Sequence, residues 1–91
     1  MLEARIRVTN TLGLHARAAA RLVRLAATFK SSVKIRRSDT NAEANAKDIL
    51  SVLSIAASRG VELLIFVDGA DESDAIQLIT KLFTDNFGEE T

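Results

Sequence analysis

This sequence has little or nothing of several residue types that commonly build functional sites. It contains no cysteine, no tryptophan and no tyrosine, and its only histidine is His15. Without cysteine the chain forms neither disulfides nor thiolate metal sites, and a reducing compartment is favoured. A single histidine also excludes a metal cluster built from several histidines of one chain. We therefore expect no metal and no other cofactor.

Signals for membranes and for export are missing as well. No apolar run approaches the roughly 18 residues that a membrane span requires. The first residues, Met1 to Arg5, lack the charged and then apolar pattern of a secretory signal peptide. We expect a cytoplasmic protein without membrane insertion.

Nucleic-acid binding is disfavoured by charge and composition. Lys and Arg number 12, and Asp and Glu also number 12, so the formal net charge is zero. Such a chain has no strong positive field for a phosphate backbone, and without Trp and Tyr it offers few rings on which bases can stack. The sequence predicts partners other than DNA or RNA.

The charges are nevertheless unevenly distributed along the chain. Residues 1–59 carry 11 Lys and Arg against four Asp and Glu, whereas residues 60–91 carry one against eight. Two explanations fit this asymmetry. Either the two parts attract each other within the fold, or a basic face around His15 meets an acidic partner.

What the chain does have is enough apolar sequence for one small packed domain. Hydrophobic residues make up 47% of the chain and charged residues 26%, which is typical of globular proteins. A length of 91 residues suits one domain. We predict a single domain over residues 1–88 and a frayed end at residues 89–91.

The spacing of apolar residues predicts the secondary structure. Alternation predicts strands over residues 2–9, 32–37 and 42–46, and a nearly continuous apolar run predicts one over 61–67. Helical spacing predicts helices over residues 16–28, 47–57 and 72–86. Asp48 and Asp71 are expected to cap the second and third helices. The most apolar strand, over 61–67, is expected in the middle of the sheet, and the element order predicts a two-layer α+β fold.

His15 lies where the loop after the first strand meets the first helix. A helix N-terminus presents unpaired backbone N–H groups and partial positive charge, which together attract an anion. A neutral imidazole there is a nucleophile, and Arg17 can hold phosphate oxygens. The pattern indicates a histidine that accepts a phosphoryl group. On composition alone, a surface or capping histidine is the more common role of such a residue.

The neighbouring residues favour a phosphoryl carrier over a hydrolase. A histidine nitrogen can take a phosphoryl group covalently and release it again, and Arg17 can offset its negative charge. No carboxylate lies close to His15 in the sequence to orient a water molecule, and no nucleotide-binding Gly-rich loop or Mg²⁺ site is evident. We expect energy and substrate to come from partner proteins, and the chain to be a carrier rather than an independent turnover enzyme.

Three segments resemble a known family. Gly13-Leu14-His15-Ala16-Arg17, followed by three alanines, is similar to the active-site signature of HPr, the histidine-containing phosphocarrier of the phosphoenolpyruvate-dependent sugar phosphotransferase system. The segment from Asn45 to Ser54 resembles the family's regulatory site, and Gly69-Ala70-Asp71-Glu72 resembles the lead-in to its last helix. The resemblance covers nearly the whole chain.

This resemblance implies both a fold and a function. The fold is an open-faced β-sandwich, in which a four-stranded antiparallel sheet carries three helices on one side. His15 would receive a phosphoryl group from phospho-enzyme I and pass it to enzyme IIA domains, with Arg17 coordinating the phosphate. The backbone amides of Ala16, Arg17 and Ala18 would bind the phosphate oxygens, and the protein would be a monomer.

Two positions depart from the family pattern. Members usually carry proline where this chain has Ala18, so the active-site loop is expected to be slightly looser and to gain one N–H donor. Asp48 stands where many members carry a serine that a regulatory kinase phosphorylates. Asp48 either caps a helix or partly imitates phosphoserine, although with less negative charge; we favour the cap.

A docking surface is also implied by the resemblance. Ile49, Leu50 and Leu53 match the family's exposed apolar patch, and positive charge around it would come from Arg17, Arg21 and Arg24. These arginines form a stripe on the first helix, and such a stripe, taken alone, is more often a solvated face.

Two other functions remain open at this point. One is a regulatory member of the same fold, in a nitrogen-related branch or as an allosteric partner. The other is an α+β interaction module without covalent chemistry. Sugar specificity is expected to reside in downstream permeases.

Overall fold

The structure is a computed structural model that describes residues 1–89. Its elements are β1 (Leu2–Arg7), α1 (Ala16–Ala27), β2 (Ser32–Arg37), β3 (Glu43–Asn45), α2 (Ile49–Ser54), β4 (Glu62–Asp68), α3 (Glu72–Thr84) and a 3-10 turn, η1 (Asn86–Gly88). Strands and helices follow one another in the predicted order. No helix within residues 1–89 combines the length and the apolar character needed to cross a bilayer.

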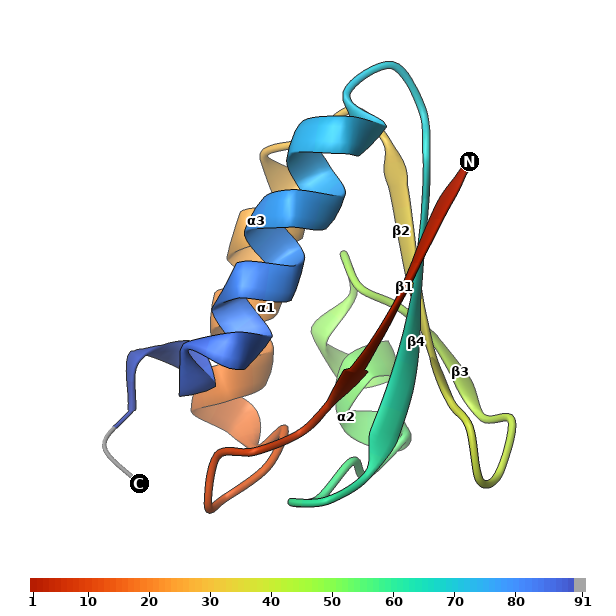
Figure 1. The fold of residues 1–91 in the computed structure, drawn as a ribbon. Helices are drawn as coiled ribbons and strands as arrows, with labels where there is room; N and C mark the ends of the chain where they lie inside the picture. Colours follow the sequence, from red (N-terminus) through yellow and green to blue (C-terminus); the bar gives the residue numbers. More distant parts are fainter. Residues whose placement is uncertain (90–91) are drawn as a thin grey trace.

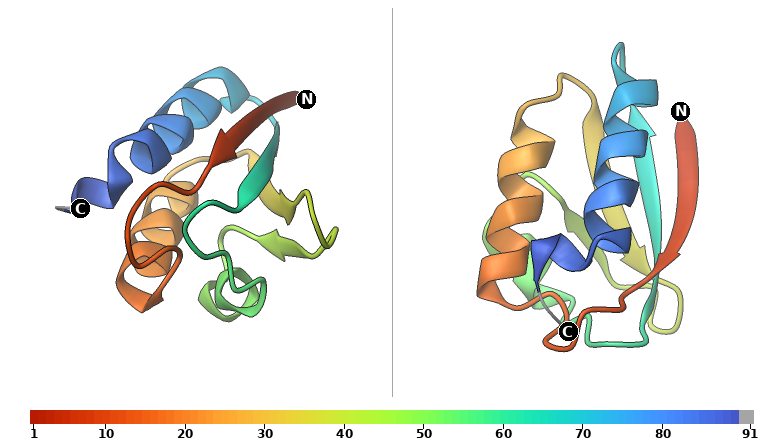
Figure 2. Two further views of the ribbon diagram at one scale, coloured as in Figure 1. Left: turned by 60° about the horizontal axis from the view of Figure 1, so that its bottom comes forward. Right: turned by 60° about the vertical axis from the view of Figure 1, so that its left-hand side comes forward.

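The strands form one antiparallel sheet in the order β1, β4, β2, β3. β4 lies between β1 and β2, so the most apolar strand is central, as its sequence predicted. The helices cover one face of this sheet and leave the other open (Figure 1). Two further views show the same two layers (Figure 2). The predicted open-faced β-sandwich is therefore confirmed.

The core lies between the sheet and the helices. Ile35 of β2 pairs with Ile65 of β4, and both side chains are fully buried. Burying an aliphatic side chain of this size contributes about 1.5–3 kcal/mol, so the alternation of buried and exposed residues holds the register of the strands. The helices complete the core with a set of fully buried residues: Ala18, Ala19, Leu22, Ala26, Ala75, Ile79 and Phe83.

Two helices are shorter than predicted because the chain turns into left-handed conformations. The second helix was expected over 47–57, but α2 ends at Ser54 and Ala56 has a φ of 51°. The third was expected to reach 86, but α3 ends at Thr84, and Asn86 and Phe87 have φ values of 53° and 57°. Residues in this conformation end a right-handed helix.

Asp71 does not cap α3, contrary to prediction, because its carboxylate is engaged elsewhere. Its Oδ2 accepts from the backbone N–H of Lys30 at 2.8 Å, and its Oδ1 accepts from the N–H of Ser31 at 2.9 Å and from Ser31 Oγ. These bonds join the start of α3 to the loop between α1 and β2. They lower the pKa of Asp71 from 3.8 to about 2, with the Ser31 hydroxyl as the largest cause.

Candidate functional site

The loop before α1 packs tightly against residue 57, and this contact fixes the position of His15 at the start of the helix. Gly13 has a φ of 66°, and a Cβ at this position would lie 2.6 Å from the carbonyl oxygen of Ala57. The next residue, Leu14, donates its N–H to the same carbonyl at 2.8 Å, and its side chain is buried. Only glycine fits at position 13, because any side chain would push the loop away from residue 57.

His15 is the N-cap residue of α1. Its backbone is extended, with φ −74° and ψ 178°, and its carbonyl accepts the N–H of Ala19 at 2.8 Å. Its Nδ1 accepts the backbone N–H of Arg17 at 3.3 Å. An atom that accepts a hydrogen bond carries a lone pair, so Nδ1 is the unprotonated nitrogen and it faces the N-terminus of the helix.

The other ring nitrogen of His15 is bound to a carboxylate. Nε2 lies 2.5 Å from Oε2 of Glu89. Because an ionised carboxylate only accepts hydrogen bonds, Nε2 is the donor and carries the ring proton. The imidazole is 25% exposed and the Glu89 side chain 10% exposed. The ring is thus held at both nitrogens while remaining accessible.

Asn10 holds the carboxylate of Glu89 by a hydrogen bond. The buried Nδ2 of Asn10 donates to Oε1 of Glu89 at 2.9 Å and to the carbonyl of Gly13 at 2.8 Å. The pKa of Glu89 is lowered mainly by this bond from Asn10 and further by His15 and Arg17, while burial acts in the opposite direction. Glu89 is therefore ionised and fixed at both oxygens.

The chain reverses its direction after α3, and this reversal places Glu89 next to His15. Phe87 is 2% exposed and packs edge-to-face on Phe83, with ring centroids 4.9 Å apart. The guanidinium of Arg21 donates to the carbonyl of Phe87. Both Figure 1 and Figure 2 place this end of the chain beside the start of α1. Glu89 was assigned to the expected frayed end at 89–91, but in the structure both of its carboxylate oxygens make hydrogen bonds; residues 90–91 lie outside the described residues.

The basic stripe on α1 is divided by these contacts. Arg17 and Arg24 are exposed, and their guanidinium groups make no hydrogen bond or ion pair within residues 1–89. Arg21 is half-buried and is engaged with Phe87. The solvent-facing positive charge next to His15 thus comes from Arg17, with Arg24 further along the helix.

Asp48 caps α2 in the way that its sequence position predicted. Its Oδ1 accepts the N–H of Leu50 at 3.0 Å and the N–H of Ser51 at 3.3 Å. On the predicted docking surface, Leu50 is 75% exposed and Ile49 is 37% exposed. Leu53 differs, because it is half-buried and packs against the core. The exposed part of the apolar patch is therefore Ile49 and Leu50, on a helix that packs against α1.

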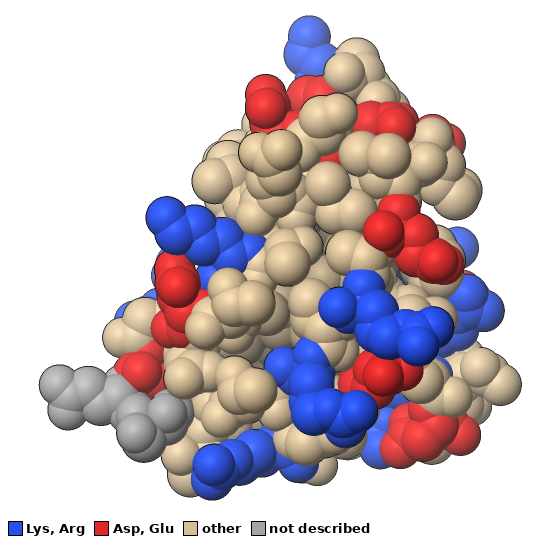
Figure 3. Space-filling view, in the orientation of Figure 1, with Lys and Arg blue, Asp and Glu red and all other residues tan. Residues whose placement is uncertain are grey.

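Ion pairs partly support the explanation that the basic first part of the chain and the acidic second part attract each other within the fold. Arg5 and Arg7 of β1 lie 3.7 Å and 3.6 Å from carboxylate oxygens of Glu62 on β4. Figure 3 shows acidic side chains gathered near the upper end of the molecule and both signs interleaved below. Some basic residues of the first part thus meet the acidic second part, whereas Arg24 is left facing solvent.

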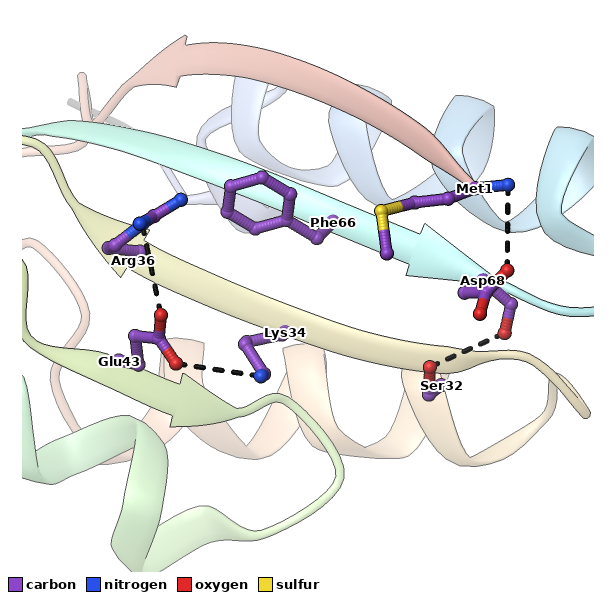
Figure 4. Close-up of a pocket in the computed structure, with 7 residues that line it drawn as sticks. All are labelled: Met1, Ser32, Lys34, Arg36, Glu43, Phe66 and Asp68. Atoms are coloured by element: carbon purple, nitrogen blue, oxygen red, sulfur yellow. Dashed lines mark hydrogen bonds and ion pairs between the residues drawn. The ribbon is translucent and has the colours of Figure 1, made fainter.

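A hollow on the open face of the sheet is a separate feature. Arg36 lies 4.7 Å above the ring of Phe66, and Glu43 pairs with Lys34 at 3.5 Å and with Arg36 at 3.9 Å (Figure 4). These charges largely satisfy one another. Within residues 1–89, no group of three or more His, Asp and Glu side chains is arranged to hold a metal ion.

The structure brings together the predicted His15 and Arg17 with two residues that the sequence reading missed. Asn10 was assigned only to a turn, and Glu89 to a frayed end. A signal for Glu89 was present in the order Asn86-Phe87-Gly88, since a large apolar residue just after a helix commonly folds back onto its last turns.

Comparisons with known proteins identify the family of this chain and agree with its fold. The sequence family described as "PTS HPr component phosphorylation site" matches residues 2–85. A phosphocarrier protein HPr of Xylella fastidiosa is 44% identical over 91 residues and covers 100% of both chains. A phosphocarrier protein NPr of Proteus mirabilis is 36% identical over 86 residues, or 94% of each chain. The crystal structure of HPr-C-His from Thermoanaerobacter tengcongensis matches all of both chains with a TM-score of 0.94 and 36% identity.

Proposed function

We propose a phosphoryl-transfer function for this chain on the premise that it belongs to the HPr phosphocarrier family of the phosphoenolpyruvate-dependent phosphotransferase system. In this proposal His15 accepts a phosphoryl group from phospho-enzyme I and passes it to enzyme IIA domains. The chain works as a cytoplasmic monomer and needs no cofactor of its own.

One observation carries the proposal. Nδ1 of His15 accepts a hydrogen bond from the helix N-terminus while Nε2 contacts a carboxylate. The nucleophilic lone pair therefore belongs to Nδ1. It becomes free to attack when the N–H of Arg17 turns from Nδ1 to the oxygens of an incoming phosphoryl group, which the helix dipole and the amides of the first turn favour.

The transfer step follows from this arrangement. Nδ1 gives its lone pair to phosphorus, the bond from phosphorus to the donor's leaving atom breaks, and that electron pair stays with the donor. Arg17 and the amides of Ala16, Arg17 and Ala18 offset the negative charge on the phosphoryl oxygens. The reverse of the same step hands the group to the next protein.

Docking is proposed at the surface beside His15. The exposed side chains of Ile49 and Leu50 supply a small apolar patch, and Arg17 and Arg24 supply positive charge next to it. Transient partners use small interfaces of this kind, in which charge speeds the encounter. Enzyme I and enzyme IIA would use the same surface in turn.

A regulatory role is the second candidate, and the similarity to a protein named NPr favours it as an alternative. In that case phosphorylation of His15 signals rather than drives transport. Rapid onward transfer to the enzyme IIA domain of a sugar permease supports transport, and phosphorylation by enzyme I without such transfer supports signalling.

The experiment for the proposed function uses phosphoenolpyruvate carrying radioactive phosphate, together with enzyme I. The chain should gain an acid-labile phosphate that the His15→Ala variant does not gain. Labelling of the variant to the same extent, or no labelling of the folded wild-type chain, would contradict the proposal and favour a non-catalytic interaction module.

A further inference from the structure

We propose that Glu89 is a positioning residue for His15. Its carboxylate holds the imidazole by Nε2, keeps the ring proton on that atom, and stabilises the positive charge that the ring gains when Nδ1 bonds to phosphorus. This inference rests on the proposed function, to which it adds a residue outside the active-site motif.

The first support is the geometry of the pair. Glu89 Oε2 lies 2.5 Å from Nε2, and the Glu89 side chain is only 10% exposed. Little water surrounds the carboxylate, so its interaction with the ring is screened less than that of a surface pair. A carboxylate behind a catalytic histidine fixes the tautomer and the orientation of the ring in other enzymes that use this arrangement.

The second support is that Glu89 is held in place before any partner binds. Asn10 Nδ2 donates to the second carboxylate oxygen of Glu89, and Asn10 is itself 1% exposed. Phe87 anchors the chain two residues earlier in the core, and Arg21 holds the carbonyl of Phe87. The carboxylate therefore does not have to be ordered during transfer, which is the condition for preorganised electrostatic stabilisation.

The third support comes from the charge balance of the transfer step. When the lone pair of Nδ1 forms the bond to phosphorus, no proton leaves the ring, because the only ring proton is on Nε2. The ring then carries a positive charge next to Glu89, on the side away from the phosphoryl oxygens. In the proposed function Arg17 binds those oxygens, and its positive charge also lowers the pKa of Glu89. The carboxylate therefore stays ionised while the ring carries its positive charge.

The same contact favours release of the phosphoryl group. A positively charged ring is a better leaving group than a neutral one, because the electron pair of the breaking N–P bond returns to a cation. Glu89 stabilises the phosphorylated ring in this protonated form. It should therefore assist both acceptance and donation, and its loss should slow transfer in both directions.

The test compares wild type with Glu89→Gln and Glu89→Ala in the full chain. His15 and Asn10 bind different oxygens of Glu89, so a glutamine in the same place would turn its NH2 group, itself a donor, toward one of them. Asp85→Asn is the matched control, because it removes one exposed negative charge from the same turn. Thermal unfolding confirms that each variant is folded.

Two readouts are measured. In proton and nitrogen NMR of uniformly ¹⁵N-labelled protein, the wild-type chain and Asp85→Asn should show a hydrogen-bonded, slowly exchanging Nε2–H proton that is lost in Glu89→Ala. Phosphoryl transfer from enzyme I and onward to enzyme IIA should fall about 10-fold in Glu89→Ala, the lower end of the effect of removing a residue that orients a functional histidine. Glu89→Asp should recover part of the rate.

The outcomes separate this inference from the proposed function. An unchanged Nε2–H signal in Glu89→Ala, or transfer rates equal to wild type in both directions, overturns the role of Glu89 while phosphorylation of His15 stands. If the wild-type chain takes no phosphate at all, the proposed function fails, and the role of Glu89 in transfer fails with it. This holds even if NMR shows the hydrogen bond between Nε2–H of His15 and Glu89.

Discussion

The backbone N–H of Arg17 donates to Nδ1 of His15 across 3.3 Å. This contact joins the only histidine of the chain to the first turn of α1, and it leaves the lone pair of Nδ1 at the helix N-terminus. The side chain of Arg17 is exposed at the same place. The residue thus orients the ring through its backbone, and in the proposed function its guanidinium binds the phosphate.

Replacing Arg17 should separate these two contributions. Arg17→Ala retains the backbone N–H and removes the guanidinium, so we expect phosphorylation by enzyme I to slow about 100-fold, the effect of removing one charged donor from a transition state. Arg17→Lys should recover only part of the rate, because an ammonium lacks the planar fork of guanidinium. Initial rates of labelling measure both, and a rate for Arg17→Ala equal to wild type would exclude a phosphate-binding side chain.

Arg24 tests the docking surface. Reversal of its charge in Arg24→Glu should slow transfer from enzyme I roughly 10-fold at low salt, because charge complementarity speeds the encounter. The effect should shrink as salt is added, since exposed charges are screened. Lys30→Glu makes the same charge reversal beyond the C-terminal end of α1, further along the chain from His15, and should leave the rate nearly unchanged. Equal rates for Arg24→Glu and wild type at low salt would remove Arg24 from the docking surface.

Substitutions of Asp48 test whether this residue acts only as the cap of α2. Serine is also a good N-cap, so Asp48→Ser should keep the stability and leave the rate of phosphorylation by enzyme I nearly unchanged. Asp48→Ala should lower the free energy of unfolding by about 1 kcal/mol, measured by urea denaturation, because the N–H groups of Leu50 and Ser51 lose their acceptor. A large rise in rate for Asp48→Ser would instead mean that the carboxylate imitates phosphoserine.

Asp71 should make part of the stability dependent on pH. Its pKa is about 2 in the folded chain and 3.8 ordinarily, so its contribution is complete above about pH 4 and is lost as the pH falls toward 2. Urea denaturation between about pH 5 and pH 2 should show a smaller loss of stability in Asp71→Asn than in wild type. Asp74→Asn, at an exposed position in the first turn of α3, should follow wild type. Parallel curves for wild type and Asp71→Asn would contradict the assignment.

The sequence was sufficient for the parts of the fold that depend on local pattern. Alternation in Ser32–Arg37 located β2 at its observed bounds, and the apolar run in β4 indicated its central place. His15 and Arg17 were predicted as site residues because they lie two residues apart at a helix start and because the motif around them resembles that of the HPr family; their roles stay predictions. The cap at Asp48 was found for the same reason, since a capping carboxylate bonds only to the next few amides.

The parts that were missed depend on contacts between distant residues. Asp71 has the same local signature as Asp48, but it bonds to Lys30 and Ser31, about 40 positions earlier. Glu89 reaches His15 only because Phe87 packs on Phe83 and reverses the chain. The order Asn86-Phe87-Gly88 signals that the chain folds back after α3, but it does not say which residue Glu89 then meets, because that depends on how α1 and α3 pack against each other.

The identity of the phosphorylated atom tests the phosphocarrier proposal most directly. The chain is labelled with ¹⁵N in histidine, phosphorylated with phosphoenolpyruvate and enzyme I, and studied by phosphorus and nitrogen NMR. We predict one phosphohistidine, with the phosphorus bonded to Nδ1 of His15 and the ring proton on Nε2. Phosphate on Nε2, on another residue, or absent from the folded chain would contradict the proposal.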